Sequence, residues 1–556
     1  MQLNRPVTSA LIARLRSDLA TANFSVSALT GLWGIDADAA LRRNQRVPAL
    51  RALDGLRETL GHTEPCATLA RLFVLGLPVD RAELEAALPA LGAAGAEELG
   101  LAASVAADRG ADADTGATVR PLLELRPYSF VDAQGAGSWW ILSDLGELAL
   151  GHPLGESHVL GVGGASLTLS GLLIPTPVAS ALDLGTGCGI QAMHASRHAD
   201  RVVATDISVR ALELAALNAA LNEIGNIEFR LGSLFEPVAG ERFDHIISNP
   251  PFVITPRVPG VPAYEYRDGG LVGDALVEAV VRGAAEHLTP GGVAQLLGNW
   301  EYHAGQDAFE RLAGWLDAPD EFDGDSARNT PNSTPAAPPG AKSPSNSHVA
   351  LDAWIIEREV QAPTLYAETW IRDGGTRADT ADFDRLYGAW LDDFEARGVS
   401  QVGFGYMLLR RTVAGPPSLR RLERLPGGLG HNPGGMGSHL AACLSAHDWH
   451  AATDDARLAR ARLTVAADVT EERHYWPGQE DPTLMTLHQG SGFGRSVPLD
   501  TGLAALVGAC DGDLDVGSIV AALAELLDVD ERELAADLFP RVRELLDDGF
   551  LQHPLA

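Results

Sequence analysis

Hydrophobic positions recur at helical spacing through the first part of the chain and at strand spacing soon after it. Leu11, Leu15 and Leu19 lie four residues apart, which predicts an amphipathic helix near the N-terminus. Two apolar runs then flank the turn-forming stretch "DAQGAG" (132–137), which predicts a β-hairpin. Short helices followed by a hairpin are typical of a winged-helix arrangement. Such a unit can contact nucleic acid or serve as a docking or lid module, and both interpretations stay open.

Strand-like and helix-like patterns alternate from residue 157 to residue 315. This alternation predicts an α/β fold in which a doubly wound, mainly parallel sheet has helices on both faces. The expected strands are 179–185, 201–207, 227–232, 243–249 and 293–300, with closing strands at 348–360 and 401–412. Ser208 is expected to cap the helix 208–224. We therefore expect a seven-stranded sheet in the middle of the chain.

Three domains are expected from these patterns. Residues 319–347 are rich in Pro, Ser and Asn and nearly lack apolar side chains, which predicts a disordered insertion inside the α/β domain. The C-terminal part ends in three helical patterns and a short apolar strand. The expected domains are a mainly helical, winged-helix-like one (1–150), the α/β domain (151–415) and a mainly helical C-terminal one (416–556).

Composition narrows the class of protein. Of the 556 residues, 46% are hydrophobic and the formal net charge is −32. No apolar run is long enough to cross a membrane, and the N-terminus lacks a signal-peptide pattern, so we expect a cytoplasmic protein without a membrane partner. The scattered cysteines disfavour a disulfide framework and a cysteine zinc site. The acidic balance disfavours non-specific binding to long nucleic acid but not a local arginine patch.

The stretch "DLGTGCG" joins an expected strand to an expected helix. It places Asp183 at the end of the strand, followed by Gly185, Gly187 and Gly189. Glycines let the backbone approach a ligand closely and adopt positive φ angles. A tight turn without a ligand is the alternative. Asp206 ends the next expected strand, where a carboxylate can accept hydrogen bonds from both hydroxyls of a ribose.

The fourth expected strand ends in "SNPPF". The side-chain oxygen of Asn249 and the carbonyl of Pro250 can each accept one N–H of a planar amine. Pro251 restricts the backbone of Pro250, and Phe252 offers a flat face for stacking. Such a loop would act by positioning and electrostatics rather than as a strong base. A double-proline loop without a catalytic role is the alternative.

In order and spacing, "DLGTGCG", "TDIS" and "SNPPF" resemble the class I S-adenosylmethionine-dependent methyltransferases. More narrowly, they resemble the subgroup that methylates planar amino or amide nitrogens, in bases of RNA and DNA or in the glutamine of release factors. The resemblance covers about residues 157–315 and extends towards 412. It implies a Rossmann-like domain with S-adenosyl-L-methionine as cofactor.

The resemblance also implies roles for single residues. Asp183 and Gly185 would line the methionine portion of the cofactor, and Gly187 and Gly189 would shape the turn. Asp206 would hold the ribose, and Ile207 would pack against the adenine. Ser233 stands where relatives usually carry an acidic residue that accepts from the adenine amino group, and its hydroxyl can still accept a hydrogen bond.

The expected activity is therefore N-methylation of a planar amino group, with Asn249, Pro250, Pro251 and Phe252 as the catalytic residues. A nucleobase of RNA or DNA is favoured over protein, because Phe252 follows the prolines and arginine-rich flanks exist. The alternatives are a protein-glutamine methyltransferase, a small-molecule methyltransferase and a non-catalytic cofactor-binding module. The pattern gives no indication of the oligomeric state.

Three further signals have ordinary structural alternatives. His439, Cys443 and His447 share one helical face and would bind zinc with one more ligand, His450 or His431, or they share that face by chance. Five arginines could contact phosphate or simply pair with nearby carboxylates: Arg410, Arg411, Arg420, Arg421 and Arg424. After the prolines, three residues could contact substrate or belong to a simple loop: Tyr264, Tyr266 and Arg267.

Overall fold

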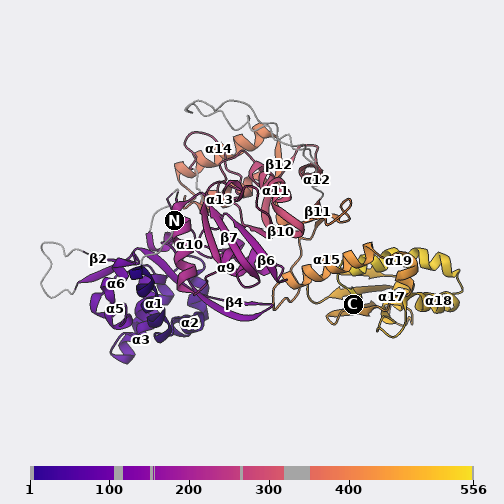
Figure 1. Cartoon of the computed structure of the whole chain (residues 1–556), viewed down its shortest axis with the longest axis horizontal. Coiled ribbons are helices and arrows are strands. Elements are labelled where there is room, and N and C mark those ends of the chain that lie inside the picture. The colour runs from indigo at the N-terminus through magenta and orange to yellow at the C-terminus, as the bar shows by residue number, and fades with distance from the viewer. Residues whose placement is uncertain are drawn as a thin grey trace. The chain divides into compact units, whose positions relative to one another are not determined.

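The chain divides into two compact units, shown in the computed structural model of Figure 1. The structure describes residues 6–105, 117–150, 154–155, 157–262, 267–317 and 351–553. The first unit comprises residues 1–130, 136–169 and 177–417, and the second comprises 131–135, 170–176 and 418–556. The insertion expected at 319–347 lies outside the described residues.

Seven strands of the first unit lie side by side in the order β11-β12-β10-β9-β6-β7-β8, within a sheet of eight strands, one more than expected. The strands are β6 (Val178–Leu184), β7 (Ala199–Asp206), β8 (Ile227–Leu231), β9 (Phe243–Ser248), β10 (Leu288–His303), β11 (Leu351–Gln361) and β12 (Val399–Arg411). Five neighbouring strands are parallel, namely β10, β9, β6, β7 and β8. Strand β12 runs antiparallel to both β10 and β11. The predicted doubly wound α/β fold is confirmed.

The strand order places β6 between β9 and β7, with Leu184 paired to Ser248 on one side and to Thr205 on the other. The chain reverses its direction of winding between β6 and β9. In open α/β sheets such a switch point, at the carboxyl ends of the strands, is where ligands bind. The glycine-rich stretch follows β6, Asp206 is the last residue of β7, and Asn249 follows β9.

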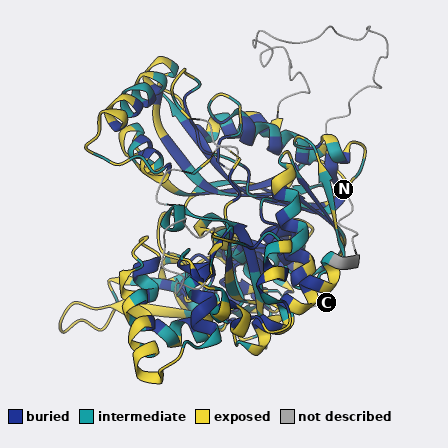
Figure 2. Ribbon diagram, turned by 90° about the vertical axis from the view of Figure 1, so that its left-hand side faces the viewer, coloured by how far each residue is buried: buried dark blue, intermediate teal, exposed yellow. Residues whose placement is uncertain are grey.

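The helices of this unit are α8 (Gly164–Leu172), α9 (Ile190–Ala195), α10 (Val209–Leu221), α11 (Ala275–His287), α12 (Ala308–Asp317), α13 (Pro363–Asp373) and α14 (Ala381–Arg397). Ser208 caps α10 as predicted, since its Oγ accepts a hydrogen bond from the amide of Ala211. Helix α9 is short, and the chain enters β7 at Ala199, four residues after the helix ends at Ala195. Buried residues, dark blue in Figure 2, follow the strands of the sheet.

The N-terminal region combines short helices with two small sheets. Its helices are α1 (Pro6–Thr21), α2 (Val26–Leu41), α3 (Val47–Leu60), α4 (Pro65–Leu69), a π-helical turn at Ala70–Val74, α5 (Arg81–Ala87), α6 (Gly92–Glu98) and α7 (Glu147–Leu150). Strands β1 (Val79–Asp80), β3 (Thr118–Pro121) and β2 (Ala102–Ser104) form one sheet, and the predicted hairpin is β4 (Leu123–Asp132) with β5 (Gly135–Asp144).

One hydrophobic core joins this region to the central sheet. Leu15 and Leu19 of α1 are fully buried, as their spacing predicted, and belong to the same cluster as Met193 of α9 and Leu214 of α10. Asn218 of α10 reinforces the junction: its Nδ2 donates to the carbonyls of Leu142 and Cys188 at 2.9 and 2.8 Å, and its Oδ1 accepts from the amide of Leu142 at 2.7 Å. The N-terminal region is thus an integral part of the first unit.

The second unit contains helices and a small antiparallel sheet. Its elements are β13 (Arg420–Arg424), α15 (Gly437–Ala451), α16 (Asp455–Ala459), β14 (Thr464–Val465), β15 (Val469–His474), β16 (Leu484–Gln489), β17 (Ser496–Leu499), α17 (Thr501–Gly508), α18 (Val516–Leu527), α19 (Glu531–Asp547) and β18 (Leu551–Gln552). The three C-terminal helices and the final strand were expected. The β15-β16-β17 sheet was not, because β15 reads "VTEERH" and exposes nearly every side chain.

Candidate active site

The glycine-rich turn after β6 has a backbone that only glycine adopts easily. Gly185, Gly187 and Gly189 have φ angles of +76°, +55° and +88°. A Cβ at Gly189 would lie 2.9 Å from the Cβ of Ala215 in α10, so this glycine allows close packing of the helix. A Cβ at Gly185 or Gly187 would meet nothing within 4 Å. These two glycines therefore face open space, as a backbone that lies against a ligand must.

Asp183 is completely buried at the end of β6. Its Oδ2 accepts hydrogen bonds from the hydroxyl of Thr186 at 2.6 Å and from the amide of Ala192 at 2.9 Å. These bonds fix the turn and the start of α9. Its Oδ1 is shielded from solvent and accepts no hydrogen bond from the residues that the structure describes. Burial raises the pKa of this carboxyl to about 7, against the opposing effect of its hydrogen bonds.

Asp206 at the end of β7 supports the same turn. Its Oδ2 accepts from the amide of Gly187 and its Oδ1 from the amide of Ser208, both at 2.9 Å. Each carboxylate oxygen has a second lone pair, so the group can accept two further hydrogen bonds. Burial raises the pKa of this carboxyl above its ordinary value.

Two aliphatic side chains lie exposed beside Asp206. Ile207 is 58% exposed, and Leu231, which pairs with Asp206 across the sheet, is 55% exposed. Exposed aliphatic groups at the carboxyl edge of a sheet can cover the face of a purine. Leu231 was not expected from the sequence, although its place at the end of β8 could have indicated it. Ser233, two residues later, is also exposed.

These observations test whether the residues fit S-adenosyl-L-methionine. There is open space for a ligand at Gly185 and Gly187. The unpaired Oδ1 of Asp183 and the spare acceptors of Asp206 offer polar contacts along the same edge of the sheet. Ile207 provides an apolar surface at the end of that edge. The donor and acceptor set fits an amino acid and a ribose joined to a purine, so the residues present fit the cofactor.

The SNPPF loop carries an unpaired acceptor. Oδ1 of Asn249 is shielded from solvent and accepts no hydrogen bond within the described part of the chain. A buried amide oxygen without a partner is costly, and such groups in folded proteins call for an explanation. Ser248 anchors the strand end beside it, since its Oγ donates to the carbonyl of Leu184 at 2.8 Å. The ring of Phe252 is half-buried and lies 5.6 Å from that of Phe404 in β12.

The loop is held from two further sides. The amide of Val253 donates to the carbonyl of Arg267 at 2.9 Å, and Phe252 forms an isolated β-bridge with Asp268. The amide of Ile254 donates to the hydroxyl oxygen of Tyr366 in α13 at 3.0 Å. Tyr366 is thus a positioning residue that the sequence did not indicate, because it lies 112 residues further along the chain.

The segment after the loop is mostly structural where it is described. Arg267 is buried and donates to the carbonyl of Trp370 and to Asp373, at 2.8 and 3.0 Å, so it serves the packing of α13 rather than an open site. Asp268 pairs with Arg257, while its Oδ2 is buried without a hydrogen-bond partner among the described residues. Tyr264 and Tyr266 lie outside the described residues.

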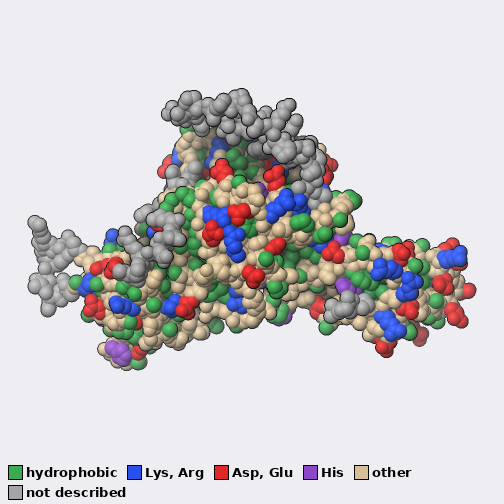
Figure 3. Space-filling model, in the orientation of Figure 1, with side chains coloured by type: hydrophobic (Ala, Val, Ile, Leu, Met, Phe, Trp, Pro, Cys, Tyr) green, Lys and Arg blue, Asp and Glu red, His purple; other side chains and the backbone are tan. Residues whose placement is uncertain are grey.

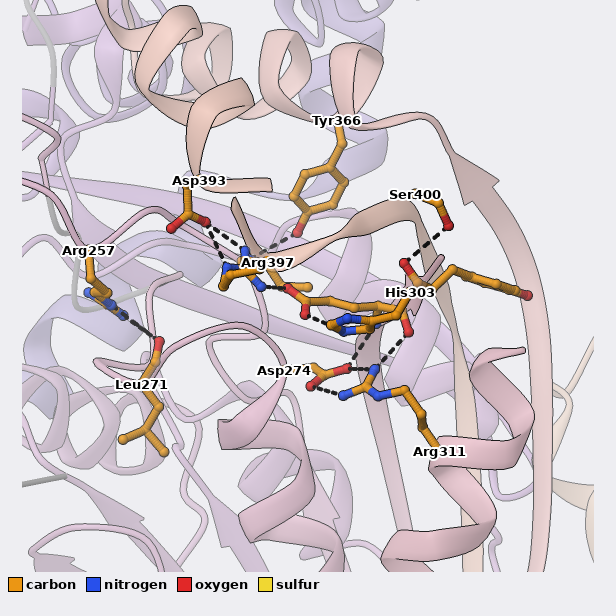
Figure 4. A network of polar contacts seen from close by, with 12 residues as sticks. Arg257, Leu271, Asp274, His303, Arg311, Tyr366, Asp393, Arg397 and Ser400 are labelled. Atoms are coloured by element: carbon orange, nitrogen blue, oxygen red, sulfur yellow. Dashed lines mark hydrogen bonds and ion pairs between the residues drawn. The ribbon is translucent and has the colours of Figure 1, made fainter. Parts of the chain in front are cut away.

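A buried network of charges supports the end of β10 (Figure 4). Arg311 binds both oxygens of Asp274 at 2.7 and 2.8 Å, and Asp274 also accepts from the amide of Glu301 at 2.8 Å. Glu301 pairs with Arg397, which binds Asp393 at 2.7 Å. Burial raises the pKa of Glu301, and the nearby charge of Asp274 adds to the effect. Because the charges are paired, we interpret this network as a rigid support.

Ion pairs engage Arg410 and Arg421 of the clustered arginines. Arg410 binds Asp352 at 2.7 Å, and Arg421 pairs with Asp548. The face drawn in Figure 3 likewise shows basic side chains next to acidic ones. These pairings favour a structural role for Arg410 and Arg421 over a role in binding phosphate.

Among the described residues, no helix is both long and apolar enough to cross a membrane.

Comparison with known proteins places the central part of the chain. Residues 164–313 match the family described as methyltransferase small domain. Residues 21–113 and 441–553 match two families described as domains of unknown function.

The curated relatives match the same central part. A ribosomal protein uL3 glutamine methyltransferase of Bradyrhizobium diazoefficiens is 37% identical over 147 residues, which cover 25% of this chain and 45% of the relative. A release factor glutamine methyltransferase of Xylella fastidiosa is 37% identical over 142 residues, covering 24% and 51%. The chain thus spans about half the length of these relatives.

Among solved structures, a 16S rRNA N2 G1207 methyltransferase of T. thermophilus, in complex with AdoMet and guanosine, aligns with a TM-score of 0.23 at 21% identity. The alignment covers 40% of this chain and 55% of that one. The family match covers strands β6 to β10 and the turns that follow β6, β7 and β9. Residues 164–313 are therefore similar to the S-adenosylmethionine-dependent methyltransferases of the methyltransferase small domain family.

Proposed function

We propose that the protein transfers a methyl group from S-adenosyl-L-methionine to the side-chain amide nitrogen of a glutamine in a protein substrate. The products are N5-methylglutamine, S-adenosylhomocysteine and a proton. A carboxamide nitrogen is a weak nucleophile because its lone pair is delocalised. The site must therefore act chiefly by holding this nitrogen in line with the methyl group.

The observation that carries the proposal is the unpaired Oδ1 of Asn249. A buried acceptor at this edge of the sheet, next to the cofactor turn, is suited to an N–H donor supplied by the substrate. The carbonyl of Pro250 offers a second acceptor, and Pro251 limits its movement. Together they can bind both N–H groups of a carboxamide and orient its nitrogen.

The remaining residues divide the work of binding and positioning. The bound cofactor supplies an electrophilic methyl group on a sulfonium. Asp206 would accept from the ribose hydroxyls, and Gly185 and Gly187 would let the backbone lie against the methionine part. Phe252 offers a ring face to the planar amide, while Tyr366 holds the loop through the amide of Ile254. None of these groups needs to act as a strong base, because the proton leaves after the nitrogen has been alkylated.

The sequence alone favoured a nucleobase as the methyl acceptor, and this proposal replaces it with a protein glutamine. Both curated relatives described above are named glutamine methyltransferases, whereas the expectation of a nucleobase rested on Phe252 and on the clustered arginines. Arg410 and Arg421 are engaged in ion pairs, which weakens that expectation. A phenylalanine ring stacks on a planar amide as well as on a base.

The test uses an extract of cells that lack the gene. The extract is incubated with the purified full chain and methyl-labelled S-adenosylmethionine. It is then divided among ribonuclease, deoxyribonuclease and protease. We expect only protease to release the label, as N5-methylglutamine identified by mass spectrometry. The Asn249→Ala variant is expected to lose activity about 100-fold or more while binding S-adenosylhomocysteine normally.

The matched control is Asn44→Gly. Asn44 is an exposed asparagine with a positive φ angle of 56°, which glycine also adopts, so this variant should keep full activity. Label released by either nuclease would replace the glutamine proposal with the nucleobase one. Cofactor binding without transfer to any macromolecule would contradict both, and would favour a small-molecule substrate or a binding module.

A further inference from the structure

A cluster of three ligand-type side chains lies in the second unit, on elements that carry no part of the candidate active site. His447 and His450 are one turn apart on α15, and Asp547 is the last residue of α19. Nδ1 of His447 and Nε2 of His450 lie 3.1 and 2.7 Å from the same Oδ1 of Asp547. The three ligand atoms lie within 4.8 Å of one another. We propose that this cluster binds a Zn²⁺ ion.

The chemistry and spacing of the cluster suit this ion. Zn²⁺ binds imidazole nitrogen and carboxylate oxygen at about 2.0–2.2 Å in a tetrahedron, which sets ligand atoms about 3.4 Å apart. The distances of 3.1 and 2.7 Å to Asp547 are shorter than this separation by about 0.3 and 0.7 Å, so the ligand atoms would have to move slightly apart around the ion. The two imidazole rings are inclined at 78° with centroids 5.1 Å apart, so they converge instead of stacking. Three protein ligands leave the fourth position to water.

The surroundings orient the ligands. Nε2 of His447 lies 3.2 Å from Oγ of Ser418, which can hold the proton on Nε2 and leave the Nδ1 lone pair for the ion. Both histidines are buried, which protects the site from bulk water. The carbonyl of His450 accepts from Arg543, and Arg543 is itself paired with Asp455 at 2.8 Å. This cation is therefore neutralised and does not oppose a metal ion.

The cluster differs from the zinc ligands that the sequence suggested. His439 and Cys443 lie 3.5 Å apart and contact each other, whereas His447 contacts Asp547 instead. The sequence missed Asp547 because it is 100 residues away from His447.

In this position the ion would join α15 to α19. The test measures the zinc content of the full chain after purification and dialysis, and then titrates the metal-stripped chain with Co²⁺. We expect a single Zn²⁺ per chain and visible d–d absorption from tetrahedral Co²⁺ that Zn²⁺ abolishes. The Co²⁺ spectrum needs no variant, so it tests the site even if a substitution prevents folding.

Variants then assign the ligands. His447→Asn and His450→Asn should lose the bound metal, and Ser418→Ala should weaken binding about tenfold. The matched control is His488→Asn, because His488 forms the same kind of contact with a carboxylate, Glu472, at 3.0 Å on the exposed sheet. The inference is overturned if the stripped wild-type chain gives no Co²⁺ spectrum, or if His488→Asn loses as much metal as the α15 variants.

Discussion

Asp183 is a carboxyl group that the fold buries completely beside the glycine-rich turn. Its pKa is raised from 3.8 to about 7, so the folded state holds a proton that the unfolded chain has released. The group therefore favours folding below about pH 4, and this contribution is lost as the pH rises to about 7. Relative to Asp183→Asn, the free energy of unfolding of the wild type should fall across this window, by about 1.4 kcal/mol for each unit of pKa difference.

Urea titrations of both proteins at several pH values measure this difference. Oδ1 of an asparagine can accept the same two hydrogen bonds as Oδ2 of Asp183, so the variant should stay folded. Above about pH 8 the two curves should run parallel, because the aspartate is then ionised in both states. Parallel curves at all pH values would show that the carboxyl of Asp183 has an ordinary pKa.

Ser233 is the residue at which the sequence is expected to depart from the family that it resembles. A carboxylate accepts from an amino group more strongly than a hydroxyl does, by about 1 kcal/mol. Ser233 is exposed, so a longer side chain fits without repacking. We expect Ser233→Asp to bind S-adenosylhomocysteine about fivefold more tightly and Ser233→Ala to bind it more weakly, as measured by calorimetry. Equal affinities of all three proteins would mean that this position does not contact the adenine.

At the scale of elements, two glycines of the turn between β6 and α9 are expected to have different roles: Gly189 allows close packing, and Gly187 allows the cofactor to bind. Gly189→Ala would drive a Cβ into Ala215 at a positive φ angle, and should cost about 3 kcal/mol of stability. Gly187→Ala meets no neighbour, so it should cost only about 1 kcal/mol from its φ angle and weaken cofactor binding about tenfold or more.

Thermal unfolding with and without S-adenosylhomocysteine separates these two effects. Gly225→Ala is the matched control, because Gly225 has no positive φ angle and open space around it, and it should change neither stability nor binding. If Gly187→Ala bound the cofactor normally, the open space beside the turn would not be the cofactor site.

The elements that the sequence predicted are those with local signals. The spacing of Leu15 and Leu19 predicted α1, and Ser208 predicted the start of α10. The glycine-rich stretch predicted the turn after β6. The support of the site was not predictable in this way. The contact between Tyr366 and Ile254 joins residues that are 112 positions apart, and no local sequence pattern indicates such a contact. The contact depends on the order of strands β10, β12 and β11 in the sheet, and a single sequence does not reveal that order.

At the scale of the whole molecule, the N-terminal region and the central sheet should unfold together, because they share one core. Asn218 is completely buried and bridges Leu142 of the hairpin to Cys188 of the glycine-rich turn. Asn218→Ala leaves buried backbone groups without partners, which should cost about 2 kcal/mol or more. Hydrogen exchange should show this loss equally for amides of α1 and of β6, since both open in one cooperative step.

The second unit provides the matched comparison for this prediction. Asn432 there bridges Gly430 and Gly492 through the same kind of side-chain to backbone bonds, at 2.9–3.0 Å. Asn432→Ala should therefore speed exchange in α15 and β16 while leaving α1 and β6 unchanged, because the two compact units have separate cores. If Asn218→Ala accelerated exchange in α1 alone, the N-terminal region would be an independently folding domain, and its helices would not stabilise the methyltransferase sheet.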